Sequence, residues 1–199
     1  MAVLNLSNRQ LRRYDLKKLF RVWLVVPALL FSVAFESSAQ TEIAKEYQVK
    51  AVFLFNFAQF VAWPTSVFPE AQTPLTIGVL GDDPFDSFLD ETVSGEKVNG
   101  HPLVIQRYRN LEDVKNCQIL FISRSEGDRM EQILTDLKGR NILTVGDMEG
   151  FAKYGGVIRF VTEENKIHLR INLEAAKNAN LTISSKLLRL AEIVQPGED

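Results

Sequence analysis

The 13 residues from Ala51 to Trp63 contain only two polar side chains, Asn56 and Gln59. A helix of this composition is apolar on every side, whereas a helix at a protein surface has one polar face. A helix that crosses a membrane needs about 20 apolar residues, so this run is too short to do so. It must therefore be buried inside a folded protein or against a partner protein.

The first 39 residues are typical of a secretory signal. A basic segment that includes Arg12, Arg13 and Arg21 precedes 14 mostly apolar residues from Val22 to Phe35, and small residues suited to a signal peptidase follow. We therefore expect residues 1–39 to be a signal peptide that is cleaved after about Ala39. Residues 40–199 would then form the folded domain, in the periplasm.

Two alternatives concern the route of export. An uncleaved membrane anchor is disfavoured, because Pro27 and Ser32 interrupt an apolar run that is already short for a bilayer. The Arg12-Arg13 pair loosely resembles a twin-arginine signal, but Asp15 occupies a position where an apolar residue is usual. The choice between the Sec and the twin-arginine route stays open.

Length and charge limit the class of protein. Removal of the signal leaves 160 residues, which suits one domain with its own core. The signal holds six of the 23 Lys and Arg residues and two of the 25 Asp and Glu residues, so the remaining chain has a net charge of −6. Nucleic-acid binding requires a basic surface that displaces counterions from phosphates. We therefore expect no nucleic acid as a partner.

Residues that could carry chemistry are sparse in the exported part. His101 and His168 lie 67 positions apart, without the close spacing of metal ligands. His168 and either Ser184 or Ser185 could belong to a hydrolytic triad, but no GxSxG motif supports this. Cys117 is the single cysteine of the chain, so an internal disulfide is impossible. We expect a protein with no enzymatic activity, metal or cofactor.

Apolar patterns predict alternating strands and helices. The predicted strands are Leu75–Leu80, Pro102–Tyr108, Cys117–Ile122 and Asn141–Val145. The predicted helices run from Thr41 to about Ala62, from Asp83 to about Thr92, from Glu126 to Lys138, from Asn172 onward and from Ser184 through Ala191. Val157–Val161 and Lys166–Ile171 are predicted to pair as a hairpin around a turn at Thr162–Asn165. This order predicts a single compact α/β domain, with a mixed, mostly parallel sheet flanked by helices and a C-terminal β-hairpin and helices.

Gly81, Asp82 and Asp83 follow one predicted strand and precede a helix, which is where doubly wound sheets bind ligands. The segment lacks the glycine pattern of a dinucleotide loop and the lysine of a phosphate loop. A turn and a helix cap explain these residues, and we favour that interpretation. A small-ligand site at Gly81, Asp82 and Asp83 is the alternative.

Two segments could provide a surface for a partner protein. The apolar helix would contribute Phe53, Phe57 and Phe60, because interface energy comes mainly from a few buried aromatic and apolar anchors. We favour burial of this helix within the monomer over contact with another chain. The predicted hairpin has one apolar face and one mixed face, since side chains alternate along a strand.

The mixed face of the hairpin is the second candidate. A solvated surface explains its basic side chains as well as a binding site does. Mixed sheet faces are nevertheless common docking surfaces. We therefore place this candidate partner site on Arg159, Glu163, His168 and Arg170.

Eight segments, in this order, point to one family. They are Tyr47–Phe57 with Trp63-Pro64, Gly78–Phe85, Cys117–Ile122, Leu143–Asp147, Gly150–Ala152, Gly155–Ile158, Ile171-Asn172 and Ser184–Ala191. Together they resemble the YfiR family of periplasmic regulators. The resemblance covers nearly the whole chain after the signal.

The resemblance implies a non-catalytic periplasmic protein that binds the periplasmic part of an inner-membrane diguanylate cyclase and holds the enzyme inactive. Such a protein controls cyclic di-GMP signalling and biofilm formation. The resemblance also implies a homodimer and sequestration by an outer-membrane lipoprotein related to OmpA. Some members form disulfides from cysteine pairs, and this chain departs from them. A periplasmic sensor or carrier of a small ligand is the alternative function.

Overall fold

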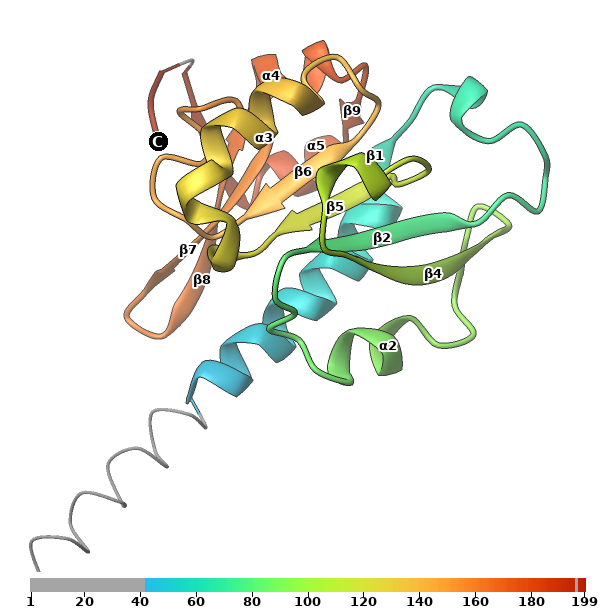
Figure 1. Cartoon of the computed structure of the whole chain (residues 1–199), viewed down its shortest axis with the longest axis horizontal. Helices are drawn as coiled ribbons and strands as arrows, with labels where there is room; N and C mark the ends of the chain where they lie inside the picture. The colour runs from blue at the N-terminus through green and yellow to red at the C-terminus, as the bar shows by residue number, and fades with distance from the viewer. Residues whose placement is uncertain (1–41, 196) are drawn as a thin grey trace, which may run out of the picture. The chain divides into compact units, whose positions relative to one another are not determined.

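An eight-stranded sheet forms the centre of the computed structural model, which describes residues 42–195 and 197–199 (Figure 1). The order of strands across the sheet is β10 (Ala191–Val194), β8 (Lys166–Asn172), β7 (Ile158–Glu163), β6 (Leu143–Gly146), β5 (Ile119–Ile122), β2 (Leu75–Leu80), β4 (His101–Tyr108) and β3 (Lys97–Val98). Residues 43–199 form one compact unit. The expected signal peptide, residues 1–39, lies outside the described residues.

The sheet is mixed and mostly parallel, which confirms the predicted fold class. β2 pairs in parallel with β4 and β5, and β6 pairs in parallel with β5 and β7. β10 is also parallel to β8, whereas β8 is antiparallel to β7 and β3 is antiparallel to β4. The chain passes from β2 to β4 on one side and then to β5 on the other side. The strand order therefore reverses between β2 and β5, where such sheets commonly bind ligands.

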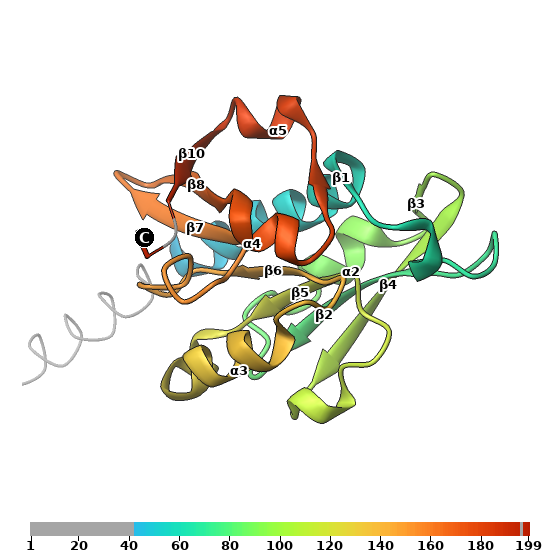
Figure 2. The ribbon, with the colours of Figure 1, turned by 90° about the horizontal axis from the view of Figure 1, so that it is seen from above.

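Alternation of side chains gives the sheet one core on each face. Ile77 and Phe121 face the helix over residues 42–60, whereas Leu80 and Leu120 face α3 (Met130–Leu137). Helix 42–60 shares its side of the sheet with α2 (Phe88–Val93), α4 (Leu173–Asn178) and α5 (Ser185–Leu188). In Figure 2, α3 lies on one side of the strands and α4 and α5 lie on the other. The central strands are buried on both faces, as parallel strands usually are.

Helix 42–60 ends two residues before the predicted end at Ala62. The next residues form β1 (Val61–Ala62), which pairs antiparallel with β9 (Thr182–Ile183). The backbone N–H of Ser184 also donates to the Phe60 carbonyl at 2.8 Å. Pairing with a segment 120 residues away therefore ends the helix. The local sequence pattern does not indicate this end.

Two other helices begin later than predicted. Oδ1 of Asp83 accepts from Phe85 N at 2.8 Å and forms a local turn, so α2 begins only at Phe88. The segment predicted to be helical from Glu126 begins as a 3-10 helix, η3 (Arg124–Arg129), before α3. Two further 3-10 helices, η1 (Thr65–Val67) and η2 (Leu111–Asp113), lie in connections.

The C-terminal part has the predicted hairpin, with a tighter turn. β7 and β8 pair up to Glu163 and Lys166, so the turn consists of Glu164 and Asn165, both with positive φ. Thr162 belongs to β7 because a two-residue turn with positive φ matches the twist of the strands. Asn172 caps α4 through Ala175 N at 2.9 Å, as predicted. The predicted helix from Ser184 through Ala191 is wrong at its end, because Ala191 begins β10 alongside β8.

Candidate functional site

One side of helix 42–60 is open to solvent. Val49, Val52, Phe53, Asn56 and Phe60 follow the i, i+3, i+4, i+7, i+11 spacing of a single helix face. Val49 and Val52 are each 48% exposed, and the other three are half-buried. We call these five residues the outer stripe. The expectation that this helix would be completely buried within the monomer is wrong.

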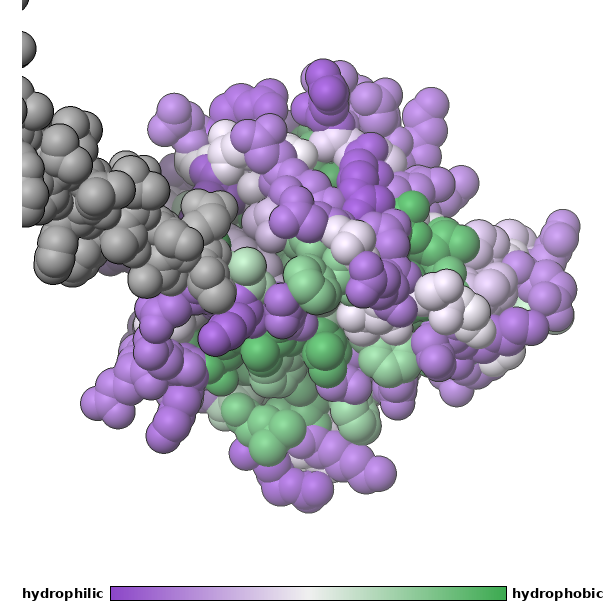
Figure 3. Space-filling model, turned by 90° about the horizontal axis from the view of Figure 1, so that it is seen from below, coloured by the Kyte–Doolittle hydropathy of each residue, from purple (hydrophilic) through white to green (hydrophobic). Residues whose placement is uncertain are grey.

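Apolar side chains also cluster on the face of the protein that carries helix 42–60. Figure 3 looks at the protein from below, the side that carries helix 42–60 and α2, and shows apolar side chains in the middle with hydrophilic ones around them. Phe88 of α2 is 38% exposed. An apolar region with a polar border is typical of a protein-binding surface.

The three phenylalanines predicted as partner contacts divide between the core and the surface. Phe57 is fully buried, and its ring stacks on Phe160 of β7 with centroids 5.8 Å apart. The half-buried Phe53 ring also lies 5.8 Å from Phe160. Phe53 and Phe60 are therefore accessible to a partner, whereas Phe57 anchors the helix to the hairpin.

A buried ion cluster fixes the same helix to the sheet. Lys50 is fully buried, and its Nζ lies 2.5 Å from Oδ2 of Asp147, the residue that follows β6. Glu46 also pairs with Lys50 one helical turn away, and the Tyr47 hydroxyl donates to Oδ2 of Asp147 at 2.9 Å. Nε of Arg124 lies 3.2 Å from Oδ1 of Asp147, without the alignment of a hydrogen bond.

The cluster keeps Asp147 ionised. Burial on its own would raise the pKa of Asp147, but attraction to Lys50 and Arg124 and the hydrogen bonds from Lys50 and Tyr47 hold that pKa below its ordinary value. Burial and the Asp147 charge raise the pKa of Tyr47. Each buried charge has an opposite charge beside it, so the cluster is suited to holding the helix in place rather than to proton transfer.

Sequence reasoning missed this cluster. Lys50 and Asp147 both lie in segments that carry the family resemblance, but neither was considered as a site residue. The available signal was a lysine immediately before an apolar helical run, since a lysine there is either exposed or paired. Its partner is 97 residues away and could not be identified without the fold.

Between β2 and β5, where the strand order reverses, polar groups of the chain form hydrogen bonds and an ion pair with one another. Gly81 N donates to the Tyr108 carbonyl at 3.0 Å, and Asp82 N donates to Ser125 Oγ at 2.9 Å. Oδ2 of Asp83 lies 2.6 Å from Nε of Arg107. A Cβ at Gly81 would lie 2.4 Å from Ser125 Oγ, so no space separates these two strand ends. The geometry supports a turn at Gly81, Asp82 and Asp83 more than a ligand site.

The hairpin register brings the four predicted residues of the mixed face together. Arg159 lies directly opposite Arg170, Val161 opposite His168, and Glu163 opposite Lys166. Glu163 and His168 are exposed. Phe160 points the other way, toward helix 42–60. The mixed face and the outer stripe therefore lie on opposite sides of the sheet.

Residues with potential chemistry are dispersed. In the described part of the chain, no group of three or more His, Cys, Asp or Glu side chains is arranged to hold a metal ion. His101 stacks on Phe68 at 4.2 Å, and its Nδ1 lies 2.8 Å from the Thr73 carbonyl. Burial raises the pKa of the Cys117 thiol to about 12. Within residues 42–195 and 197–199, no helix has the length and apolar character needed to cross a membrane.

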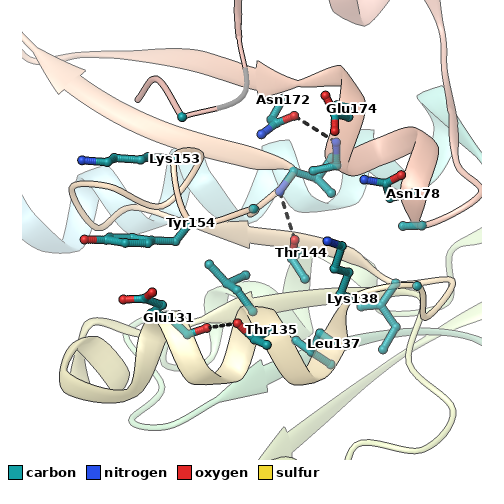
Figure 4. Close-up of a pocket in the computed structure, with 18 residues that line it drawn as sticks. Glu131, Thr135, Leu137, Lys138, Thr144, Lys153, Tyr154, Asn172, Glu174 and Asn178 are labelled. Carbon is teal, nitrogen blue, oxygen red and sulfur yellow. Dashed lines mark hydrogen bonds between the residues drawn. The ribbon is translucent and has the colours of Figure 1, made fainter.

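A cavity of about 400 Å³ lies between α3, α4 and the segment that connects β6 to β7. Figure 4 shows Lys138 and Asn178 toward one end of it and Glu131, Lys153 and Tyr154 toward the other. Thr144 Oγ1 in its wall already accepts from Val157 N at 3.0 Å. The cavity is of a size that small ligands occupy, and its lining mixes both signs of charge.

Comparison with known proteins gives one family. The family model described as YfiR/HmsC-like matches residues 47–192. No curated protein matches the sequence.

Two solved structures are similar to parts of this chain. One is the ABC domain in complex with L-Trp from Streptococcus pneumonia, with 10% identity and a TM-score of 0.45 over 60% of this chain and 55% of that one. The other is a conserved domain protein from Vibrio cholerae O1 biovar eltor, with 13% identity and a TM-score of 0.46 over 65% of this chain and 56% of that one. The chain thus spans little more than half of each, and these similarities say nothing about its function.

Proposed function

This chain belongs to the YfiR/HmsC-like family, and from that premise we propose that it binds the periplasmic part of an inner-membrane diguanylate cyclase and represses the enzyme. Membership of the family indicates a periplasmic regulator of diguanylate cyclase rather than a catalyst. Repression would lower cyclic di-GMP in the cytoplasm and so limit biofilm formation.

The outer stripe is the observation that carries the proposal. It presents two half-exposed valines, Val49 and Val52, beside the accessible rings of Phe53 and Phe60. Covering each valine would contribute roughly 1 kcal/mol, because complete burial of such a side chain contributes about 1.5–3 kcal/mol. Anchors at this spacing suit recognition by an apolar surface or groove of a partner, as in other helix-mediated contacts.

The stripe has a rigid base. Lys50 and Phe57, on the adjoining buried side of the same helix, hold it against Asp147 and Phe160. A surface that is already ordered loses less conformational entropy when it binds, which increases affinity. The buried side of the helix would therefore support the interaction without touching the cyclase.

Repression requires a difference in the affinity of the regulator for the two forms of the cyclase. A regulator shifts the cyclase toward its inactive form only if it binds that form more tightly than the active form. A shift from 1% to 99% inactive enzyme requires a preference of about 10⁴-fold. A second protein that competes for the regulator would release the cyclase, and the proposal assigns that role to an outer-membrane lipoprotein related to OmpA.

A homodimer is also part of this proposal. The mixed face of the hairpin, with Glu163 and His168 exposed, lies on the side of the sheet opposite the outer stripe. A self-contact there would leave the outer stripe free for the cyclase. Light scattering on the purified protein and on a Glu163→Lys variant tests this, because removal of the acidic side chain leaves only basic residues and Val161 on the mixed face, and repulsion between two such faces would make the variant monomeric.

A matched pair of substitutions tests the cyclase contact. Val52→Asp places a charge on the outer stripe, whereas Leu173→Asp places the same charge on α4 at a side chain that is 39% exposed. We expect Val52→Asp to raise cellular cyclic di-GMP several-fold, toward the level of the deletion strain, and Leu173→Asp to leave it unchanged. Thermal unfolding and immunoblotting would verify that both variants fold and accumulate.

Each result would be informative. If deletion of the gene leaves cyclic di-GMP unchanged, the regulatory role is wrong. If deletion raises cyclic di-GMP but folded Val52→Asp still represses, the role stands and the outer stripe is not the contact. Crosslinking from position 56 in intact cells, followed by identification of the captured protein, tests the contact directly.

A periplasmic sensor of a small ligand is the second candidate, and the cavity beside α3 is the observation that favours it. A ligand there would raise the melting temperature of purified wild-type protein. Glu174→Ala, in the cavity wall, would reduce this rise, whereas Asp82→Ala would not. A rise that persists in Glu174→Ala and disappears in Asp82→Ala would instead assign the ligand to Gly81, Asp82 and Asp83.

A further inference from the structure

The side chain of Asp199 occupies a set of hydrogen-bond donors next to β7 and β8. Its Oδ2 accepts from Gly150 N at 2.7 Å and from Nη1 of Arg159, and its Oδ1 accepts from Ala152 N at 3.2 Å. Nη1 of Arg170 donates to the Asp199 main-chain oxygen at 2.9 Å. Both oxygens of one carboxylate are thus held by groups from two different segments of the chain.

The two backbone donors belong to a segment whose shape does not depend on Asp199. Gly150 has φ +78, a conformation that glycine adopts without strain. Phe151 is fully buried, and its ring fills the space beside Gly146 and Gly156, where an added Cβ would lie 2.5 and 2.2 Å from it. Phe151 therefore anchors the segment between its two N–H donors. Backbone N–H groups of one short segment that converge in this way form an anion-binding concavity.

The two arginines provide a second reason for an anion at this position. Arg159 and Arg170 are direct cross-strand neighbours on one face, an arrangement that like charges destabilise. The Arg159 side chain is only 13% exposed, so solvent screens it poorly. Nε of Arg159 is buried without a hydrogen-bond partner in the described structure, which leaves a donor for a ligand with a further acceptor. Glu192 neutralises Arg170 in part, with Oε2 2.9 Å from its Nε.

We propose that Gly150, Ala152, Arg159 and Arg170 form a carboxylate-binding site, and that Asp199 is an internal ligand which an external carboxylate displaces. The site is distinct from the outer stripe, since it lies on the mixed face of the hairpin. The external carboxylate belongs either to a small carboxylic acid or to an acidic side chain of another polypeptide. Both sources offer the same planar pair of oxygens.

An internal ligand changes the apparent affinity in a calculable way. A group on a short tether has an effective concentration in the millimolar range, so it competes with any external carboxylate at every protein concentration. Removal of the Asp199 carboxylate should therefore tighten apparent binding of an external carboxylate by about tenfold or more. Removal of a charge elsewhere on the same segment should not.

Asp199→Ala and Glu198→Ala form a matched pair, because Glu198 carries the same charge on the same segment and its side chain accepts only from Gln195 N in the described structure, at 3.1 Å. ¹⁵N-labelled wild type and both variants would be titrated with sodium acetate, and separately with a blocked tripeptide of the sequence of residues 197–199, at constant ionic strength. The amide resonances of Gly150 and Ala152 report on the site directly. In Asp199→Ala, we expect saturable shifts of both resonances, with an apparent Kd at least tenfold lower than in wild type and in Glu198→Ala.

Saturable binding of acetate to Asp199→Ala would show that a small carboxylic acid suffices. Binding of the tripeptide alone would show that the carboxylate must come from a polypeptide, and both results support the site. Arg159→Lys added to Asp199→Ala should weaken the binding, because lysine lacks the planar donor geometry of arginine. The proposal is overturned if neither probe shifts Gly150 and Ala152, or if Asp199→Ala and wild type bind with equal affinity.

Discussion

Nζ of Lys50 lies 2.5 Å from Oδ2 of Asp147, although 97 residues separate the two and neither side chain is more than 1% exposed. The pair joins helix 42–60 to the carboxyl end of β6 and so fixes which side of the helix faces the sheet. An isolated charge in such surroundings would be very costly, whereas a pair with additional hydrogen bonds is tolerated. The orientation of the outer stripe therefore depends on a contact on the buried side of the helix.

Lys50→Met should destabilise the protein strongly. The substitution leaves Asp147 as a buried carboxylate without its closest cation, and breaking such a pair typically costs about 3–5 kcal/mol. Arg124→Met is the matched control, because Arg124 pairs with the same carboxylate but its side chain is 60% exposed. Its loss should cost less than about 1 kcal/mol. Urea unfolding of both variants at pH 7 measures the difference, and equal losses would refute the ranking.

The same cluster predicts how stability depends on pH. The pKa of Asp147 in the folded state lies below its ordinary value, which is about 3.9 in an unfolded chain. Its contribution is therefore complete above about pH 4 and is lost as the pH falls through the folded-state pKa. We expect the free energy of unfolding to decrease in that range, and to decrease less steeply in Asp147→Asn. Parallel urea titrations of wild type and variant between pH 2 and 7 would reveal a difference in slope, and parallel curves would contradict the assignment.

Patterns within single segments were enough to predict the strands and the alternating architecture. Leu75–Leu80 is a strand at the predicted residues, because six consecutive residues that are all buried fit a strand covered on both faces better than a helix or a loop. Contacts between distant segments could not be predicted in this way. Val61 and Ala62 leave the helix because β9 pairs with them, and Ala191 is a strand residue because β8 lies beside it.

The candidate site shows the same division between local and distant information. The shared face of Arg159, His168 and Arg170 follows from strand alternation and was predicted, whereas the register was not, because the turn predicted over Thr162–Asn165 consists of Glu164 and Asn165 alone. The exposed side of helix 42–60 was not, because an all-apolar helix has no polar face that marks its outside. The ligand of Arg159 was not predicted either, since Asp199 reaches it from 40 residues away.

Gly156→Ala should destabilise the fold because of Phe151. A Cβ at Gly156 would lie 2.2 Å from the Phe151 ring and 2.7 Å from its carbonyl oxygen, and backbone cannot move away as a flexible side chain can. Overpacking of this kind costs about 1–3 kcal/mol. Gly127→Ala is the control, because its Cβ would meet only Met148 Sδ at 3.7 Å. Thermal unfolding should separate the two variants by several degrees, and a Gly156→Ala protein as stable as Gly127→Ala would contradict the packing argument.

Cys117 should be unreactive in the folded protein. It is 3% exposed, its thiol pKa is raised to about 12, and Sγ lies 3.0 Å from the Ile119 carbonyl. Only the thiolate attacks alkylating agents, so both burial and the pKa slow the reaction. Iodoacetamide at pH 8 should label the denatured protein completely and the native protein negligibly, as mass spectrometry can determine. Rapid labelling under native conditions would show that the segment leading into β5 opens readily.

Glycine substitutions at two neighbouring residues, one in the hairpin turn and one at the end of β7, should change stability in opposite directions. Glu164 has φ +49, a conformation that costs an ordinary residue about 1 kcal/mol and costs glycine almost nothing. Glu164→Gly should therefore stabilise the protein by about 0.5–1 kcal/mol. The greater conformational entropy that glycine gives the unfolded chain offsets part of this gain. Glu163 is a strand residue of β7, so Glu163→Gly should destabilise the protein by about 0.5–1 kcal/mol. Urea unfolding of the two variants is the measurement, and destabilisation by Glu164→Gly as large as that by Glu163→Gly would mean that the turn does not hold this conformation in solution.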